Sequence, residues 1–291
     1  MTGQASFRVI AIPDCLNGDP RRVEQAISAL YTDHWLPGTR PVLDLAAVSF
    51  VRPYGAVQLL GACVRLAGAT GRMVELRNIR LPVHAYLRRV NFFTSVPNVV
   101  ITHNPFNSAD ELSRSPASTN VLELHPIALP SDITAAVEAA DRILKYWLSH
   151  SLKDRGRVID LVSEACNNVV EHSDGTGWVV AQKYERQGVA VELAIADDGI
   201  GIPGSLERAR GRVASADSEY ITKAIKGLSS KRPQKSVGLP TMRTTTGTSG
   251  GYLFIRSSQG EVMARDGRFL PRVRSVVVPG TQLAMCFESS N

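Results

Sequence analysis

Three short segments in the C-terminal half of the chain carry residue types that could together bind a nucleotide. The first runs from Glu164 to His172, the second from Asp197 to Gly201, and the third is Gly280-Thr281 within a late apolar strand. Carboxylate and amide groups can hold a metal ion or a polar ligand edge, and glycines let a ligand approach the backbone. A single binding site requires helices and strands that bring these three segments close together.

The first segment is predicted to lie on a helix. Residues four positions apart share a helical face, so Glu164, Asn168 and His172 form one polar stripe. Apolar residues occupy other faces: Val158, Val162, Ala165, Val169 and Val170. The stripe could hold a metal ion and phosphates, and the alternative is the solvated face of an amphipathic helix.

The second segment follows a predicted hairpin. Strands are expected at 178–184 and 189–196, and the second strand leads directly into Asp197-Asp-Gly199-Ile-Gly201. A carboxylate beside a bare backbone suits a flat ligand edge. An ordinary Asp-Gly turn is the alternative, but it predicts that the chain returns at once as another strand, whereas 204–237 is polar and basic.

That polar stretch is predicted to be a mobile lid over a ligand site. It ends at Ser236-Val-Gly238, just before a predicted helix, where free backbone N–H groups could meet phosphate oxygens. Five basic residues of the lid could neutralise a terminal phosphate, and a solvated surface is the alternative for most of them: Lys223, Lys226, Lys231, Arg232 and Lys235.

Taken together, these segments resemble the GHKL family of ATP-binding domains, which includes DNA gyrase, sensor histidine kinases and anti-sigma-factor serine kinases. The resemblance covers about residues 121 to 287 and implies an α/β sandwich (the Bergerat fold) with an ATP lid. It implies that the side chain of Asn168 binds Mg²⁺ and that Glu164 is the general base. For His172 it implies a basic position near the phosphates, with a capping role at the surface as the alternative.

The resemblance also implies the residues that hold the nucleoside and phosphates. Asp197 would accept a hydrogen bond from the adenine amino group, which would select against guanine. The remaining implied ATP-binding residues are Gly199, Gly201, Gly238, Leu239 and Thr281. The family often has Gly-x-Gly where this chain has Ser236-Val237-Gly238, so the phosphate clamp would be looser if residue 236 needed a positive φ.

The N-terminal third shows a different pattern. Strands are predicted at 7–12, 42–45 and 73–76, and helices at 54–70 and 83–90, which indicates a small, largely parallel α/β sheet. The run from Pro41 to Gly55, with the apolar segments that follow, resembles a STAS domain, the fold of anti-sigma-factor antagonists. That family typically has Asp-Ser-Ser-Gly with a phosphorylated serine, where this chain has Arg52-Pro-Tyr54-Gly55. The phospho-switch is therefore expected to be absent, and Tyr54 is expected to pack rather than to be modified.

We predict a STAS-like domain at 1–103, a polar linker at 104–120 and a GHKL ATP-binding domain at 121–291. The latter domain is expected to begin with an amphipathic helix at 131–150. The 291 residues, 44% of them hydrophobic, suffice for two domain cores.

Composition bears on the cellular location of the protein and on its binding partners. The four cysteines, Cys15, Cys63, Cys166 and Cys286, lack metal-type spacing and are expected to be reduced thiols. No leader or membrane-spanning run is recognised, so a cytoplasmic protein is expected. The net charge of +6 admits nucleic-acid contact, but no binding motif supports it, and we expect none.

The leading hypothesis is a regulatory protein that binds ATP and Mg²⁺, resembles anti-sigma-factor serine/threonine kinases, and acts on a sigma factor or an antagonist-like protein. One alternative is an ATP-hydrolysing clamp whose nucleotide drives homodimer formation. The other is a module that holds ATP without splitting it. Histidine kinase activity is disfavoured, because it needs a phospho-accepting histidine on a long pair of dimerisation helices, whereas the predicted helix at 131–150 has a single histidine at its end.

Overall fold

The structure is a computed structural model that describes residues 6–32, 34–102, 120–147, 152–184, 189–230 and 238–289. The chain divides into two compact units, residues 1–118 and 119–291, and each is described by itself. Most of the predicted linker at 104–120 lies outside the described residues. The exact domain limits therefore stay a prediction.

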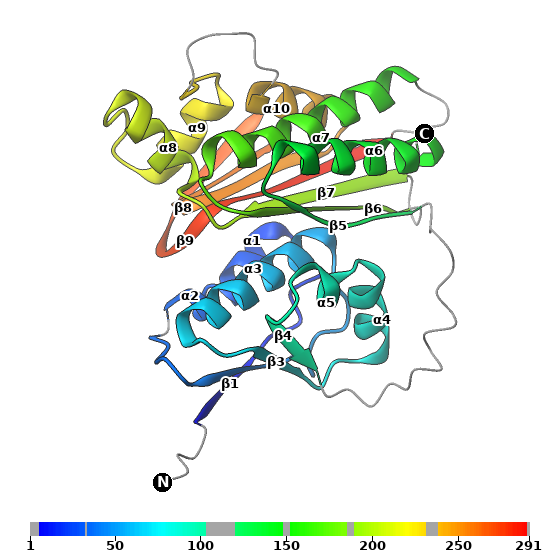
Figure 1. Cartoon of the computed structure of the whole chain (residues 1–291). Coiled ribbons are helices and arrows are strands. Elements are labelled where there is room, and N and C mark those ends of the chain that lie inside the picture. Colours follow the sequence, from blue (N-terminus) through cyan, green and yellow to red (C-terminus); the bar gives the residue numbers. More distant parts are fainter. Residues whose placement is uncertain are drawn as a thin grey trace. The chain divides into compact units, whose positions relative to one another are not determined.

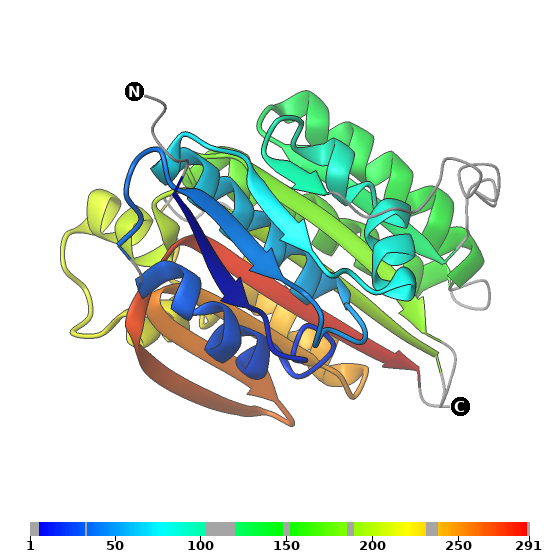
Figure 2. The same cartoon turned by 90° about the horizontal axis from the view of Figure 1, so that it is seen from below.

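The first unit contains a four-stranded parallel sheet of order β1-β2-β3-β4 (Figure 2). Its strands are β1 (Phe7–Ala11), β2 (Arg40–Asp44), β3 (Val74–Arg77) and β4 (Val100–Thr102). Its helices are α1 (Pro20–Ile27), α2 (Ala29–Thr32), α3 (Pro53–Thr70), α4 (Leu81–Arg89) and α5 (Phe92–Ser95). The predicted parallel α/β pattern is confirmed, while the finer STAS assignment remains a proposal.

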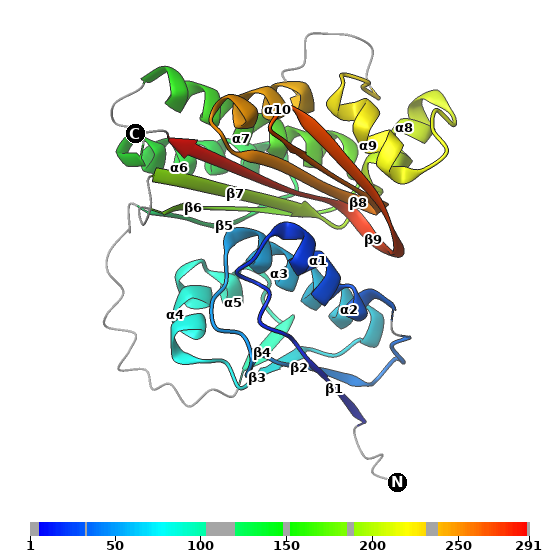
Figure 3. The same cartoon turned by 180° about the vertical axis from the view of Figure 1, so that it is seen from behind.

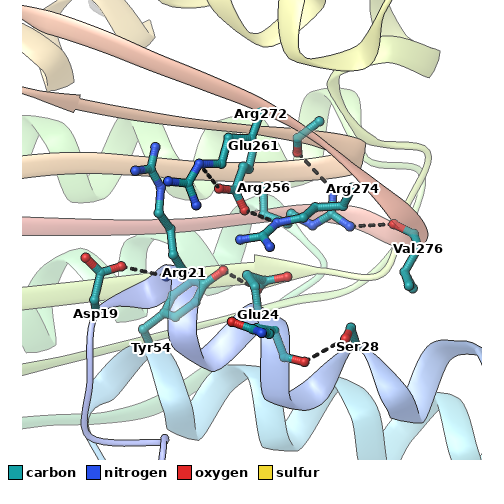
Figure 4. A network of polar contacts seen from close by, with 12 residues as sticks. Asp19, Arg21, Glu24, Ser28, Tyr54, Arg256, Glu261, Arg272, Arg274 and Val276 are labelled. Carbon is teal, nitrogen blue, oxygen red and sulfur yellow. Dashed lines mark hydrogen bonds and ion pairs between the residues drawn. The ribbon is translucent and has the colours of Figure 1, made fainter.

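Helix α3 is the central helix of this unit and starts with a proline in its first turn. It packs closely on the segment after β1, because a Cβ at Gly55 would lie 2.3 Å from the carbonyl oxygen of Leu16. The hydroxyl of Tyr54 donates a 2.5 Å hydrogen bond to Oε1 of Glu24 on α1 (Figure 4). Tyr54 is thus a packing residue of this unit, as predicted.

The second unit contains a five-stranded antiparallel sheet of order β5-β6-β7-β9-β8. Its strands are β5 (Val121–Ile127), β6 (Gly177–Tyr184), β7 (Val189–Asp197), β8 (Tyr252–Arg265) and β9 (Arg268–Ser289). Its helices are α6 (Pro130–Trp147), α7 (Leu152–His172), α8 (Gly201–Arg210), α9 (Asp217–Ile225) and α10 (Gly238–Thr248). These helices lie on one face of the sheet (Figures 1 and 3).

The core of the second unit lies between that sheet face and the helices. Alternate residues of β7, Val191, Leu193 and Ile195, are buried there, as period-two alternation requires. On α7, Val158, Val162, Ala165 and Val169 are buried against them, which confirms the predicted apolar face. Because the apolar face of α7 packs on the sheet, the polar stripe on the helix faces away from this core.

The long hairpin of β8 and β9 turns at Asp266 and Gly267, which both have positive φ. Within the hairpin, Arg274 on β9 donates from Nε to Oε2 of Glu261 on β8 over 2.7 Å (Figure 4). Arg256 donates to the carbonyl oxygens of Gly260 and Val276. The bonds to Glu261 and Val276 join the two strands, and the bond to Gly260 lies within β8, beside a register shift near Ser258.

Among the described residues, none of the helices has the length and apolar character that crossing a bilayer requires. The four cysteines are all free, as expected, and Cys63, Cys166 and Cys286 are buried.

Candidate functional site

The polar stripe of α7 lines a cavity on the helical side of the sheet. Glu164, Asn168 and His172 are each half-buried and all three contribute to the cavity wall. Glu164 and His172 are eight positions apart, so the stripe extends over about 12 Å at the usual helical rise. The predicted stripe therefore faces a cavity and not open solvent.

Asp197 lies at the end of β7, where the strand stops and the chain turns. Its Oδ1 accepts a hydrogen bond from the backbone nitrogen of Gly199 over 3.0 Å, and the backbone N–H of Thr281 also donates to this carboxylate. Burial raises the pKa of Asp197 to about 7, although the two N–H donors act in the opposite direction. The site therefore contains a buried acceptor that is protonated in part at neutral pH.

Two glycines permit the close backbone contacts around Asp197. A Cβ at Gly280, where φ is +73°, would lie 1.9 Å from the carbonyl oxygen of Asp197. A Cβ at Gly199 would lie equally close, 1.9 Å, to the carbonyl oxygen of Ser173 at the end of α7. Contacts this close exclude any side chain. These glycines therefore let β7, β9 and the end of α7 meet closely at Asp197, and we refer to this meeting point as the Asp197 corner.

The cavity has a volume of about 680 Å³, within the range of small-molecule sites. It brings together eight of the nine predicted site residues: Glu164, Asn168, His172, Asp197, Gly201, Gly238, Leu239 and Thr281. Gly199 stands apart from the lining, because its bare Cα faces Ser173. The geometry gives Gly199 a packing role against Ser173, and its ligand contact stays a prediction.

The predicted lid forms regular structure over much of its length. Helices α8 and α9 occupy 201–210 and 217–225, and neither helix is predicted from the sequence within this stretch. Tyr220 and Leu206 are buried between these helices, which gives the segment a small apolar core of its own. Residues 231–237 lie outside the described residues, and the predicted mobility of the lid is untested.

The basic residues proposed for a terminal phosphate are directed elsewhere in the described part of the lid. Nζ of Lys223 donates to the carbonyl oxygen of Val213, and Nζ of Lys226 lies 5.6 Å from the ring centroid of Phe269. Neither lines the cavity. The other three candidates, Lys231, Arg232 and Lys235, lie outside the described residues, as does Ser236.

Helix α10 begins at Gly238, where φ is +31°, so the helix predicted to follow Gly238 is present and includes this glycine. Gly238, Leu239 and Pro240 line the cavity, so the first turn of α10 faces it. The N–H groups of a first helical turn lack intrahelical partners and carry partial positive charge. An anionic ligand can therefore be stabilised at this wall.

Several lining residues were not predicted from the sequence. Ser205 and Ser230 enter the cavity from α8 and from the segment after α9, while Ile202 and Leu206 contribute apolar wall. Ser257 on β8 supports the corner from behind, because its Oγ donates to the carbonyl oxygen of Gly280 and accepts from the backbone nitrogen of Ile202. Isolated serines have no distinctive spacing, so no sequence signal could have identified them.

The cavity fits a magnesium-bound purine nucleotide in its donor set. Asp197 offers a buried acceptor at one end, Asn168 offers a hard amide oxygen on α7, and α10 offers its N-terminus. Across the described residues, no cluster of three or more His, Cys, Asp or Glu side chains could hold a metal ion by itself. A magnesium ion at Asn168 would consequently take most of its ligands from phosphate and water.

Residues 153–270 match the family model described as "Histidine kinase-, DNA gyrase B-, and HSP90-like ATPase". This range includes the stripe of α7, the Asp197 turn and the start of α10, while Thr281 follows it on β9. A comparison with curated proteins gave no match, and neither did a comparison with solved structures.

Proposed function

Because residues 153–270 form a histidine kinase-, DNA gyrase B- and HSP90-like ATPase domain, a type of domain that binds ATP, we propose that this chain is an ATP-dependent serine/threonine protein kinase. In this proposal it uses Mg²⁺ and resembles the anti-sigma-factor kinases. Its substrate would be a regulatory protein, either a sigma factor or an antagonist-like protein.

One observation carries the proposal. Glu164, Asn168 and Asp197 come from two separate segments of the sequence, yet all three line the same cavity of about 680 Å³. A carboxylate, a neutral amide and a second, buried carboxylate are the groups expected for a general base, a magnesium ligand and an adenine acceptor. The presence of all three groups in one cavity therefore supports a site for Mg-ATP.

Each of these residues has a defined task in the proposal. Asp197 accepts a hydrogen bond from the exocyclic amino group of adenine and so orients the base. Asn168 would supply its side-chain oxygen to Mg²⁺. Glu164, one helical turn earlier, would take the proton from the attacking hydroxyl, whose oxygen would bond to the terminal phosphorus as the bond to the leaving ADP oxygen breaks. The first turn of α10 would stabilise phosphate charge.

The first unit is proposed to be STAS-like and to recruit the partner without a phospho-switch of its own. This inference is supported by its parallel sheet and by the Arg52-Pro-Tyr54-Gly55 sequence at the start of α3. Tyr54 is committed to its hydrogen bond with Glu24 and is therefore a poor phosphate acceptor. The four free cysteines are compatible with the reducing cytoplasm that we propose as its location.

The test follows the terminal phosphate of γ-labelled ATP. Purified protein, Mg²⁺ and a lysate of the source cell are incubated with the label, using the wild-type chain and Glu164→Gln. Glu138→Gln is the matched control, since Glu138 is an exposed glutamate of α6 that does not line the cavity.

Label on a second protein that requires Glu164, but not Glu138, would support the kinase. Free phosphate alone with the same dependence would instead identify an ATP-hydrolysing clamp, and nucleotide-driven dimer formation would then be measured by light scattering. ATP binding without Glu164-dependent release of label would leave a nucleotide-sensing interaction module.

A further inference from the structure

Three polar side chains from three different segments meet in the wall of the cavity. Oγ of Ser230, just after α9, lies 3.2 Å from Nδ1 of His172 at the end of α7. Oγ of Ser205 on α8 lies 3.3 Å from Oγ of Ser230. All three side chains are half-buried and line the cavity, so a ligand in the cavity can reach them. We refer to Ser205, Ser230 and His172 as the hydroxyl cluster.

The hydroxyl cluster lies at the end of α7 that is bonded to the turn after Asp197, which would be the nucleoside side of the proposed ATP site. His172 is one helical turn beyond Asn168 and two turns beyond Glu164, the proposed base. The next residue, Ser173, accepts from the backbone nitrogen of Ile200 over 2.7 Å, in the turn that follows Asp197. His172 therefore lies between the proposed magnesium ligand and the turn of the proposed adenine acceptor.

The chemistry of the cluster suits a sugar better than a phosphate. Each serine hydroxyl can donate and accept a hydrogen bond, and an imidazole can do either according to its tautomer. Among the described residues that line the cavity there is neither a lysine nor an arginine. A pair of adjacent sugar hydroxyls needs both donors and acceptors, and this cluster supplies both.

We propose that the hydroxyl cluster of Ser205, Ser230 and His172 is a ribose subsite that binds the 2′-hydroxyl and makes the cavity selective for ribonucleotides over deoxyribonucleotides. The inference rests on the proposed ATP site and deepens it by defining the class of nucleotide. It also assigns His172 to the sugar and not to the phosphates. Ser230 is a specificity-determining residue in this assignment, because it bridges the other two side chains.

The experiment compares the affinities of ATP and 2′-deoxy-ATP by isothermal titration calorimetry in the presence of Mg²⁺. The proteins are the wild-type chain, Ser230→Ala, Ser230→Thr and Ser249→Ala. Ser249→Ala is the matched control, because it removes a serine hydroxyl from the end of α10, outside the cavity lining. Melting temperatures without nucleotide establish that each variant is folded.

We expect the wild-type chain and Ser249→Ala to bind ATP about three- to tenfold more tightly than 2′-deoxy-ATP, the usual range for one neutral hydrogen bond. Ser230→Ala should weaken ATP binding and leave 2′-deoxy-ATP almost unchanged, so that the two affinities converge. Ser230→Thr retains a hydroxyl and should retain the preference.

Equal affinity of the wild-type chain for the two nucleotides would overturn the ribose subsite and leave the proposed ATP site intact. An equal loss of affinity for both nucleotides in Ser230→Ala would also overturn it, since Ser230 would then only tie α8 and α9 to α7. Failure of the folded wild-type chain to bind either nucleotide would refute the proposed function itself.

Discussion

Oδ1 of Asp197 accepts a hydrogen bond from the backbone nitrogen of Gly199, two residues later in the same turn, over 3.0 Å. This short loop holds the carboxylate in one orientation at the end of β7. Burial raises the pKa of Asp197 to about 7, and the N–H groups of Gly199 and Thr281 only partly offset this effect. The proposed adenine acceptor is therefore also the group whose protonation should change near neutral pH.

Asp197→Asn should stabilise the nucleotide-free protein at alkaline pH. The folded chain retains a proton on Asp197 up to about pH 7, whereas the unfolded chain releases it near the usual value of 3.8. The stability contributed by this proton is thus present below about pH 4 and is lost as pH rises to about 7.

The uncharged asparagine avoids that loss. We expect the variant and the wild-type chain to have similar free energies of unfolding near pH 4 and the variant to be more stable by up to a few kcal/mol at pH 8. Urea denaturation at the two pH values measures the difference. Parallel pH profiles of the two proteins would show that Asp197 does not titrate in this range.

ATP affinity should rise with pH through about 7. The adenine amino group donates a hydrogen bond, so it favours the ionised carboxylate of Asp197, and binding should release a proton at pH 6. Titration calorimetry in buffers of different ionisation enthalpy counts that proton.

Asp197→Asn serves as the control, because any proton release that remains in this variant comes from ATP itself. The variant should also bind ATP more weakly. Tighter binding at low pH would indicate that a protonated Asp197 donates to the ring.

Asn168→Ala should uncouple magnesium from nucleotide binding. Asn168 is the only amide among the lining residues on the proposed stripe, and its oxygen is the proposed protein ligand of Mg²⁺. In the wild-type chain, ATP should raise the melting temperature more with Mg²⁺ than with EDTA. In the variant that difference should shrink severalfold. A full magnesium effect in Asn168→Ala would place the ion elsewhere.

Gly199→Ala should disturb the Asp197 corner although Gly199 does not line the cavity. The added Cβ would lie 1.9 Å from the carbonyl oxygen of Ser173, so the turn or the end of α7 must shift. We expect a loss of about 1–3 kcal/mol in the free energy of unfolding and weaker ATP binding.

Gly247→Ala is the matched control for this glycine. A Cβ at Gly247, on α10, would have no neighbour within 4 Å. Alanine should stabilise that helix by about 0.5–1 kcal/mol. If urea denaturation gave the two variants the same stability, the close contact at Gly199 would not constrain the corner.

The amino-acid sequence by itself determined part of the candidate site, namely α7, the strand that ends at Asp197 and the residue types on them. Periodicity predicted α7 with its polar stripe, the hairpin of β6 and β7, and the parallel sheet of the first unit, because each pattern depends on neighbours a few residues apart. The type and order of Glu164, Asn168 and Asp197 predict a nucleotide site from the sequence alone.

Only the tertiary structure decided how distant segments combine. Antiparallel pairing of β7 with β9 brings Gly280 against Asp197, and close packing of Gly199 on Ser173 adds the end of α7. Tertiary packing also accompanies the helices α8 and α9 within the expected lid, where Lys223 and Lys226 contact groups outside the cavity. It also created the hydroxyl cluster. Such contacts join residues tens of positions apart, and local propensity contains no information about them.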